Sequence, residues 1–138
     1  MRERLFTLGE ANRLLPLVRS ITRDVVEHYG AVKAEIGALS ELRARRRAGE
    51  PVDSALRAQD RRIERRLEGL RRLVDELESL GARLRDYERG VVDFPAAAFD
   101  GRHFTFYCWM LGEGAVDHWH LEAEGFGERR PVPAGSSA

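Results

Sequence analysis

Two histidines and a glutamate near the end of the chain have the types and spacing to do chemistry. His118, His120 and Glu122 alternate along a segment with apolar neighbours. Residues two apart in a β-strand point to one face, so these side chains would lie together. Two imidazoles and a carboxylate are ligands that a divalent ion such as zinc accepts, with one position left for water. The spacing therefore predicts a metal site, which Asp93 or Glu113 could complete.

The same part of the chain holds further residues that could form a polar pocket. Arginine pairs with carboxylates through two parallel hydrogen bonds, so its arginines could hold acidic groups in place or bind an anion. The single cysteine lies in an apolar run, where a buried structural thiol is the simpler interpretation and a nucleophile the alternative. The residues expected around the pocket are Asp93, Arg102, Cys108, Glu113, His120 and Arg129.

A small β module is expected to position these residues. Nine of the eleven aromatic residues follow position 80, and short apolar runs alternate there with glycine-containing turns. The pattern predicts strands at 82–86, 91–95, 102–111 and 116–121, with turns at Gly90 and at Asp100-Gly101. The region 82–131 is therefore predicted to form an antiparallel meander of three or four strands. A frayed tail is expected at 132–138.

The first part of the chain, 7–80, shows the spacing of two long helices. Thr7 and Glu10 predict a capping box at the start, and Pro16 predicts a kink or a break. Apolar residues then recur at steps of three, four and seven, which is typical of an antiparallel coiled coil. A turn at 48–52 separates the helices, with Asp53 or Ser54 expected to cap the second and Gly81 to end it.

Together these elements predict one domain of the α+β class over residues 1–138. A long, coiled-coil-like antiparallel helical hairpin would carry the β module at its base, and Asn12 is expected to bond the helix start to that module. Two such helices bury one stripe each, so we expect a homodimer formed through the hairpin. The alternative is that the β module folds back over the apolar seam.

Charge and composition narrow the class of protein. The 138 residues include 23 basic and 23 acidic side chains, and no apolar run approaches the roughly 20 residues of a membrane span. We therefore expect no membrane partner, and a single cysteine fits a reducing cytoplasm. Many arginines lie on the hairpin, but acidic residues interleave with them at helical spacing, which favours a solvated face over an RNA-binding patch.

Several short motifs, in one order along the chain, resemble a bacterial family. They are Phe6-Thr7-Leu8, Glu10-Ala11-Asn12, Leu15-Pro16, Val92-Asp93-Phe94-Pro95, Asp100-Gly101-Arg102, Cys108-Trp109, Leu111-Gly112-Glu113, Trp119-His120, and Gly125-Phe126 with Arg129 and Pro131. From about Phe6 to Pro131 the chain is similar to the uncharacterised family called domain of unknown function 2203. The resemblance implies a small prokaryotic, cytosolic protein and carries over no catalytic residues.

The sequence leaves three functions open. The leading prediction is a non-catalytic binding or assembly protein with a polar pocket on the β module. The alternative is a hydrolase that uses His118, His120 and a carboxylate to hold a divalent metal such as zinc and activate water. The third is RNA binding through the hairpin arginines. No nucleophile elbow and no glycine-rich phosphate loop is present to favour another class of enzyme.

Overall fold

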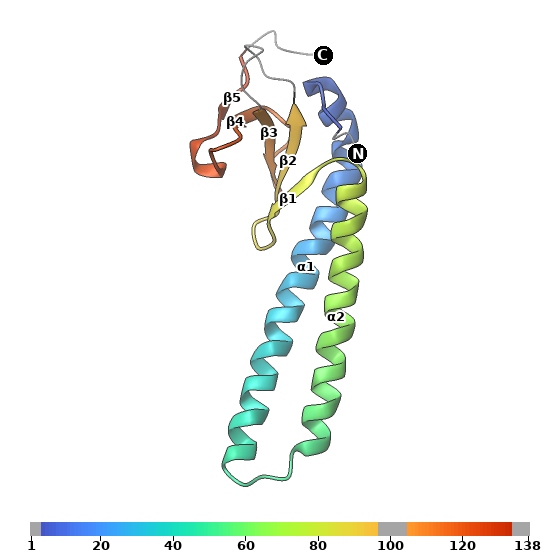
Figure 1. Ribbon diagram of the computed structural model, residues 1–138, viewed down its shortest axis with the longest axis vertical. Coiled ribbons are helices and arrows are strands. Elements are labelled where there is room, and N and C mark those ends of the chain that lie inside the picture. Colours follow the sequence, from blue (N-terminus) through green and yellow to red (C-terminus); the bar gives the residue numbers. More distant parts are fainter. Residues whose placement is uncertain (1–3, 97–104, 134–138) are drawn as a thin grey trace.

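The computed structural model, which describes residues 4–96 and 105–133, shows a helical hairpin with a β-sheet at one end (Figure 1). The helices are α1 (Leu8–Arg47) and α2 (Asp53–Ser79). The strands are β1 (Arg83–Asp86), β2 (Val91–Ala96), β3 (Thr105–Met110), β4 (His118–Leu121) and β5 (Arg130–Pro131), with a short 3-10 helix η1 (Phe126–Glu128) before the last strand. The α+β hairpin-plus-meander prediction is confirmed.

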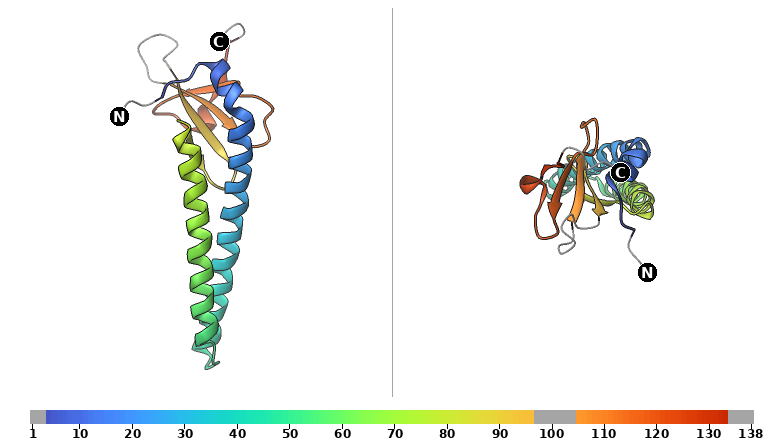
Figure 2. Two further views of the ribbon diagram at one scale, coloured as in Figure 1. Left: turned by 90° about the vertical axis from the view of Figure 1, so that its right-hand side faces the viewer. Right: turned by 90° about the horizontal axis from the view of Figure 1, so that it is seen from above.

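The sheet is an antiparallel meander in which the strands follow one another in the order β1-β2-β3-β4-β5. It has one strand more than the four predicted. The additional strand is β5, which is two residues long and pairs with β4 through His118–Pro131 and Trp119–Arg130. A strand so short has no alternating pattern to recognise. Figure 2 shows the sheet beside the start of α1 and the end of α2, with the hairpin tip far from it.

The helix ends differ in how closely they follow the sequence signals. The capping box is present: Thr7 Oγ1 accepts from the Glu10 amide at 3.1 Å, and the Glu10 carboxylate accepts from the Thr7 amide at 2.9 Å. α1 continues through Pro16 without a break. The predicted side-chain cap of α2 is wrong, because Val52 occupies the N-cap and Asp53 instead pairs with Arg46 at 3.1 Å.

Apolar side chains spaced by three, four and seven residues hold the two helices together. Those buried on α1 include Val18, Ile21, Val25, Val32 and Leu39, and those buried on α2 are Leu70 and Leu77. Of the buried polar residues on the helices, Gln59 donates to the Glu35 carbonyl at 2.7 Å and is thereby satisfied. In the described part of the chain, no helix has the length and apolar character to cross a membrane.

The two faces of the sheet have different roles, and the strand register assigns each residue to one of them. β2 pairs with β3 so that Val92 opposes Trp109 and Asp93 opposes Cys108. Val92, Phe94, Tyr107 and Trp109 belong to the core that the sheet shares with the helices. Because side chains alternate along a strand, Asp93 and Cys108 point to the opposite, outer face. That outer face carries the site described below.

Three contacts fix the β module to α1 and to the segment just before it. Asn12 bonds both backbone groups of Val116, donating to its carbonyl at 2.9 Å and accepting from its amide at 2.8 Å, which confirms the expected bond from this residue to the module. Gly90 has a φ of 75°, as its turn predicted, and lies against α1. The Phe6 amide donates to the Pro95 carbonyl at 2.7 Å, beside the end of β2.

Some predictions fall on residues that the structure does not describe. The tight turn at Asp100-Gly101 and the pocket residue Arg102 lie between the two described ranges, and most of the expected tail lies beyond the second. At the other turns the glycine signals are confirmed, since Gly81 follows α2 with a φ of 98°.

Candidate functional site

A cluster of three potential metal ligands lies on the outer face of the sheet. Asp93 on β2 and Cys108 on β3 are directly opposite each other, and His120 on β4 is a diagonal neighbour across the central strand. One ligand atom from each residue lies within 4.8 Å of the other two. All three side chains are buried, with exposed fractions of 2 %, 0 % and 3 % in chain order. The register of three strands therefore assembles a group that is far apart in sequence.

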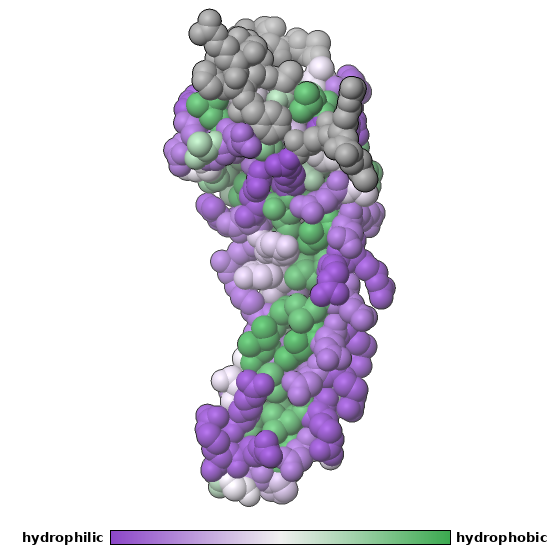
Figure 3. Space-filling model, viewed as in Figure 1, coloured by the Kyte–Doolittle hydropathy of each residue, from purple (hydrophilic) through white to green (hydrophobic). Residues whose placement is uncertain are grey.

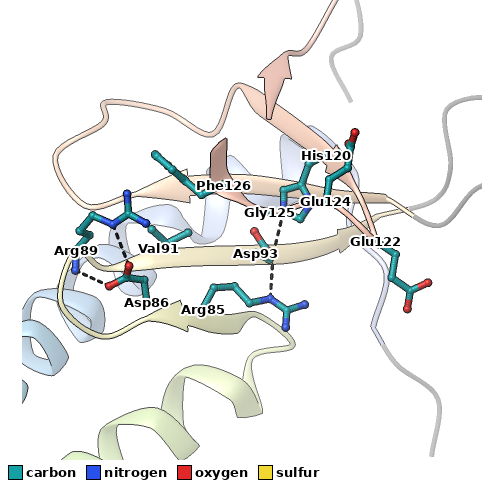
Figure 4. Close-up of a pocket in the computed structure, with 10 residues that line it drawn as sticks. All are labelled: Arg85, Asp86, Arg89, Val91, Asp93, His120, Glu122, Glu124, Gly125 and Phe126. Atoms are coloured by element: carbon teal, nitrogen blue, oxygen red, sulfur yellow. Dashed lines mark hydrogen bonds and ion pairs between the residues drawn. The ribbon is translucent and has the colours of Figure 1, made fainter. Parts of the chain in front are cut away.

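Asp93 is at the centre of this cluster. Its Oδ2 accepts from His120 Nε2 and from Arg85 Nε, each at 3.0 Å (Figure 4). Its Oδ1 is buried and has no hydrogen-bond partner among the described residues. Burying a carboxylate oxygen without a hydrogen-bond donor costs free energy. A cation or a proton bound to this oxygen would offset that cost.

The ring of His120 is held by a backbone carbonyl. Its Nδ1 lies 2.8 Å from the Leu121 carbonyl oxygen, which only accepts, so Nδ1 carries a proton. Nε2 then points at Asp93. Burial opposes the charged form of His120, but the bonds to Asp93 and Leu121 outweigh it, and the pKa is raised above its ordinary value. Without a metal, Nε2 therefore has the Asp93 carboxylate as its hydrogen-bond partner.

Cys108 sits in an environment that keeps the thiol protonated. Burial, followed by the neighbouring Asp93 carboxylate, raises the pKa of Cys108 to about 12, while the nearby Arg129 opposes this effect. A reactive cysteine needs a lowered pKa, so the cysteine is not activated as a nucleophile in this arrangement. The simpler interpretation of the sequence, a buried cysteine, agrees with the structure.

A second polar contact supports the cluster from the side. Arg129 and Glu113 face each other with two parallel hydrogen bonds, one of them 2.8 Å from Nη1 to Oε1. Glu113 also accepts from the Met110 amide at 2.9 Å, and its carbonyl accepts from Trp109 Nε1 at 3.0 Å. The bond to Arg129 is the main cause that lowers the pKa of Glu113. This pair joins the β3–β4 connection to the segment before β5.

A pocket opens beside the cluster. Its volume is about 320 Å³. The lining residues are Arg85, Asp86, Arg89, Val91, Asp93, His120, Glu122, Glu124, Gly125 and Phe126. Figure 4 shows Asp93 between Arg85 and His120 at one side of the pocket, with Arg89 and Phe126 at the other. Two of the three cluster residues thus reach this space, and both signs of charge line it.

The converging group differs from the set predicted by strand alternation. Among the described residues it consists of Asp93, Cys108 and His120, and it leaves out His118 and Glu122. His118 Nδ1 instead faces the Asp117 carboxylate at 2.7 Å. β4 ends at Leu121, so Glu122 lies beyond the strand and is exposed at the pocket. The alternation rule therefore did not extend to the third residue.

Several pocket residues were missed in the sequence, and Arg85 is one that bonds to the cluster. Arg85 was expected only as part of a short strand, yet it donates to Asp93 within the cluster. The signal that could have found it is the turn at Gly90, because a hairpin around that glycine brings β1 against β2. The irregular register of that pair, which shifts between Leu84 and Asp86, made the position of Arg85 hard to assign from spacing alone.

The described arginines of the hairpin lie outside the Asp-Cys-His cluster and the pocket beside it. Several of them pair with acidic neighbours, as Arg45 does with Glu50 and Arg72 with Glu68. Such exposed pairs are typical of a solvated helix face. RNA binding by this surface remains an untested prediction.

The fold and the cluster define a helical-hairpin protein with a small β module that carries a buried Asp-Cys-His group. A family model described as an uncharacterized conserved protein (DUF2203) matches residues 4–132. The chain therefore belongs to that family, as its motifs indicated. No curated protein and no solved structure matches the chain.

Proposed function

We propose that the protein is a metal-binding module, in which Asp93, Cys108 and His120 hold a divalent transition-metal ion of the zinc type. The observation that carries the proposal is the convergence of three different donor atoms within 4.8 Å inside the protein. Thiolate, imidazole and carboxylate together are a ligand set that zinc accepts and that magnesium or calcium does not favour.

The orientation of His120 supports this role. A histidine that binds a metal through one ring nitrogen usually donates the other N–H to a carbonyl or carboxylate, which fixes the ring. Here Nδ1 donates to the Leu121 carbonyl, so Nε2 is the nitrogen left to bind a metal in place of its proton. Oδ1 of Asp93, which has no hydrogen-bond partner, is a negatively charged oxygen that would bind the ion as a second ligand.

The spacing of the donors fits an ion after a small adjustment. Ligand atoms around tetrahedral zinc lie about 3.3 to 3.9 Å apart, given metal–ligand distances of about 2.0 to 2.3 Å. Two donor atoms at the 4.8 Å limit would therefore approach each other by roughly 1 Å, whereas His120 Nε2 and Asp93 Oδ2 are already 3.0 Å apart. The pocket beside Asp93 and His120 provides the route of entry and space for a fourth ligand, either water or a bound molecule.

The proposed role is binding, with the pocket as the place where the metal meets its ligand. A reducing cytoplasm, where the single cysteine remains a thiol, is the compartment that suits this site. The hydrolase alternative has one observation in its favour, namely that the pocket leaves room for a metal-bound water and a substrate. It predicts turnover of simple esters by zinc-loaded protein, and loss of that turnover in the His120 variant described next.

The test compares two histidines on the same strand. The full chain is loaded with Zn²⁺, dialysed and analysed for metal per chain, and Co²⁺ is used in parallel because thiolate-bound cobalt has a near-ultraviolet charge-transfer band. We expect about one ion per chain in the wild type and in the control His118→Ala, and a loss of at least about tenfold in affinity in His120→Ala and Cys108→Ser.

Each outcome has a clear meaning. Metal in the wild type with a thiolate–cobalt band that Cys108→Ser abolishes supports the proposal. Equal metal binding in His118→Ala and His120→Ala, or no binding by the wild type, overturns it. Circular dichroism of every variant shows whether the fold is intact. Should His120→Ala unfold, the nearly isosteric Asp93→Asn takes its place as the variant that removes a metal ligand.

A further inference from the structure

One flank of the hairpin exposes apolar side chains that the molecule itself does not cover. Ile36 on α1 is 50 % exposed and Leu67 on α2 is 40 % exposed. Figure 3 shows an apolar strip along the hairpin, bordered on both sides by hydrophilic residues. Exposed apolar strips with polar borders are typical of interaction surfaces.

Helical spacing places the exposed side chains on the same flank. Arg43 and Asp60 line one hollow between the helices near the tip. Ile36 is seven residues before Arg43, and Leu67 is seven residues after Asp60, so each lies two turns along the same side of its helix. Val74, another seven residues on, is partly buried beside the core. The strip therefore combines α1 and α2.

The β module covers only the upper part of this flank. Tyr87, in the β1–β2 turn, contacts Tyr29, with ring centroids 5.6 Å apart. Tyr29 lies seven residues before Ile36, and the neighbouring Lys33 forms an ion pair with Glu88. Below this contact the flank is open. The predicted alternative, a β module folded back over the whole seam, therefore does not account for Ile36 and Leu67.

Along the outer border of the strip on α2, charged residues alternate in sign, so that this row is complementary to a second copy of itself in the antiparallel orientation. The border residues are Arg57, Glu64, Arg71 and Glu78, each seven after the last and all exposed. Their signs alternate, and within the described ranges the structure gives none of the four an ion pair. Around a point between residues 67 and 68, Arg57 mirrors Glu78 and Glu64 mirrors Arg71.

We propose that two copies of the chain associate through this flank, with their α2 helices antiparallel and a two-fold axis near Leu67. Such an axis sets Arg57 against Glu78 of the second copy, and Glu64 against Arg71 of the second copy, each contact occurring twice. The paired flanks bury Ile36 and Leu67 and complete a four-helix arrangement with the β modules at opposite ends. Charge order selects the second copy as the occupant, because the same row read in a parallel orientation would oppose like charges.

Charge reversal tests both the partner and its orientation. The molar mass of the wild type is measured by light scattering over a range of concentrations, and we expect twice the mass of one chain. Glu64→Arg and Arg71→Glu should each weaken association by about tenfold, because each sets like charges together twice. The matched control is Arg65→Glu, the same reversal at a residue that lines the opposite flank with His28.

Mixing the two weakened variants is the decisive measurement. In a mixed pair, residue 64 of each copy faces an opposite charge at residue 71 of the other, so a heterodimer should form at close to wild-type affinity. The double variant Glu64→Arg/Arg71→Glu should also recover as a homodimer. A monomeric wild type, or a dimer that neither reversal weakens, would overturn the proposal, as would failure of the mixture to associate. Leu67→Glu should be folded by circular dichroism and monomeric by light scattering.

Discussion

Glu113 shows how a single carboxylate can hold two segments of the β module together. It is half-buried, it bonds Arg129 with both oxygens, and it accepts from the Met110 amide. Charge-assisted bonds of this kind are stronger than neutral ones, and bidentate geometry adds orientation. The sequence predicted Glu113 as part of a pocket. In the structure it contacts Met110 and Arg129 beside the Asp-Cys-His cluster.

We expect Glu113→Gln to destabilise the protein by about 2 kcal/mol near neutral pH, because one charged partner of a half-buried pair is removed. The lowered pKa of Glu113 gives the pH dependence. Its contribution is fully present above the ordinary glutamate pKa and is lost as the pH falls through the lowered folded-state pKa. Urea unfolding of both proteins should therefore show a difference near neutrality that shrinks in acid.

The control for this measurement is Glu41→Gln, an exposed glutamate on α1. It should change stability by less than about 0.5 kcal/mol. A variant at Glu113 that unfolds at the same urea concentration as the wild type would show that the pair with Arg129 contributes no net stability.

At this scale the sequence identified most of the polar residues but not their grouping. Asp93, Cys108 and His120 were each expected around the pocket. That they converge depends on strand register, which is set by turn geometry and by burial of the opposite face rather than by any local motif. Glu122 was grouped with the histidines because a strand end cannot be read to one residue.

Among the elements, the turn at Gly90 has the tightest requirement. With a φ of 75°, a methyl group there would lie 2.9 Å from both Leu111 Cβ and Thr22 Cγ2. These atoms belong to the β3–β4 connection and to α1, so the turn packs closely against both. The sequence identified the turn from its glycine, but not the close contact that makes the glycine necessary.

Gly90→Ala is expected to cost about 2 to 4 kcal/mol, from the positive φ and from the displaced neighbours. The contrasting variant is Gly37→Ala, which lies inside α1 with open space around its Cα. It should stabilise the protein by about 0.5 to 1 kcal/mol, because alanine loses less backbone freedom in a helix. Thermal unfolding of both variants checks the two signs, and a neutral Gly90→Ala would show that the turn can shift away from α1.

The element boundaries themselves were largely predictable where periodicity was strong. Both helices and four strands followed from apolar spacing and glycine turns. The start of α2 did not, because Asp53 pairs with Arg46 across the hairpin turn and does not cap. β5 has too few residues for any pattern, and it forms because β4 offers an edge.

At the scale of the whole molecule, the proposed metal site and the proposed dimer surface lie in different parts of the chain. The Asp-Cys-His cluster lies on the β module, whereas the exposed flank lies lower on the hairpin (Figure 1). The two regions share no described contact between their defining residues. Changes in distant regions are usually additive, so each should be altered without affecting the other.

We therefore expect Leu67→Glu to bind as much zinc per chain as the wild type, and His120→Ala to keep the wild-type molar mass. Elemental analysis and light scattering on the same samples provide both readouts. A joint loss in either variant would contradict the separation and would indicate that the dimer helps to form the metal site.

The bonds from Asn12 to Val116 and from Phe6 to Pro95 have a consequence for how the protein is made. The start of α1 is synthesised before α2, whereas the groups that hold it in place follow α2 in the chain. A nascent chain that has reached only the end of α2 can close its hairpin, since those contacts are local. We expect the first turn of α1 to remain accessible to proteases until Pro95 and Val116 have been synthesised and have formed these bonds.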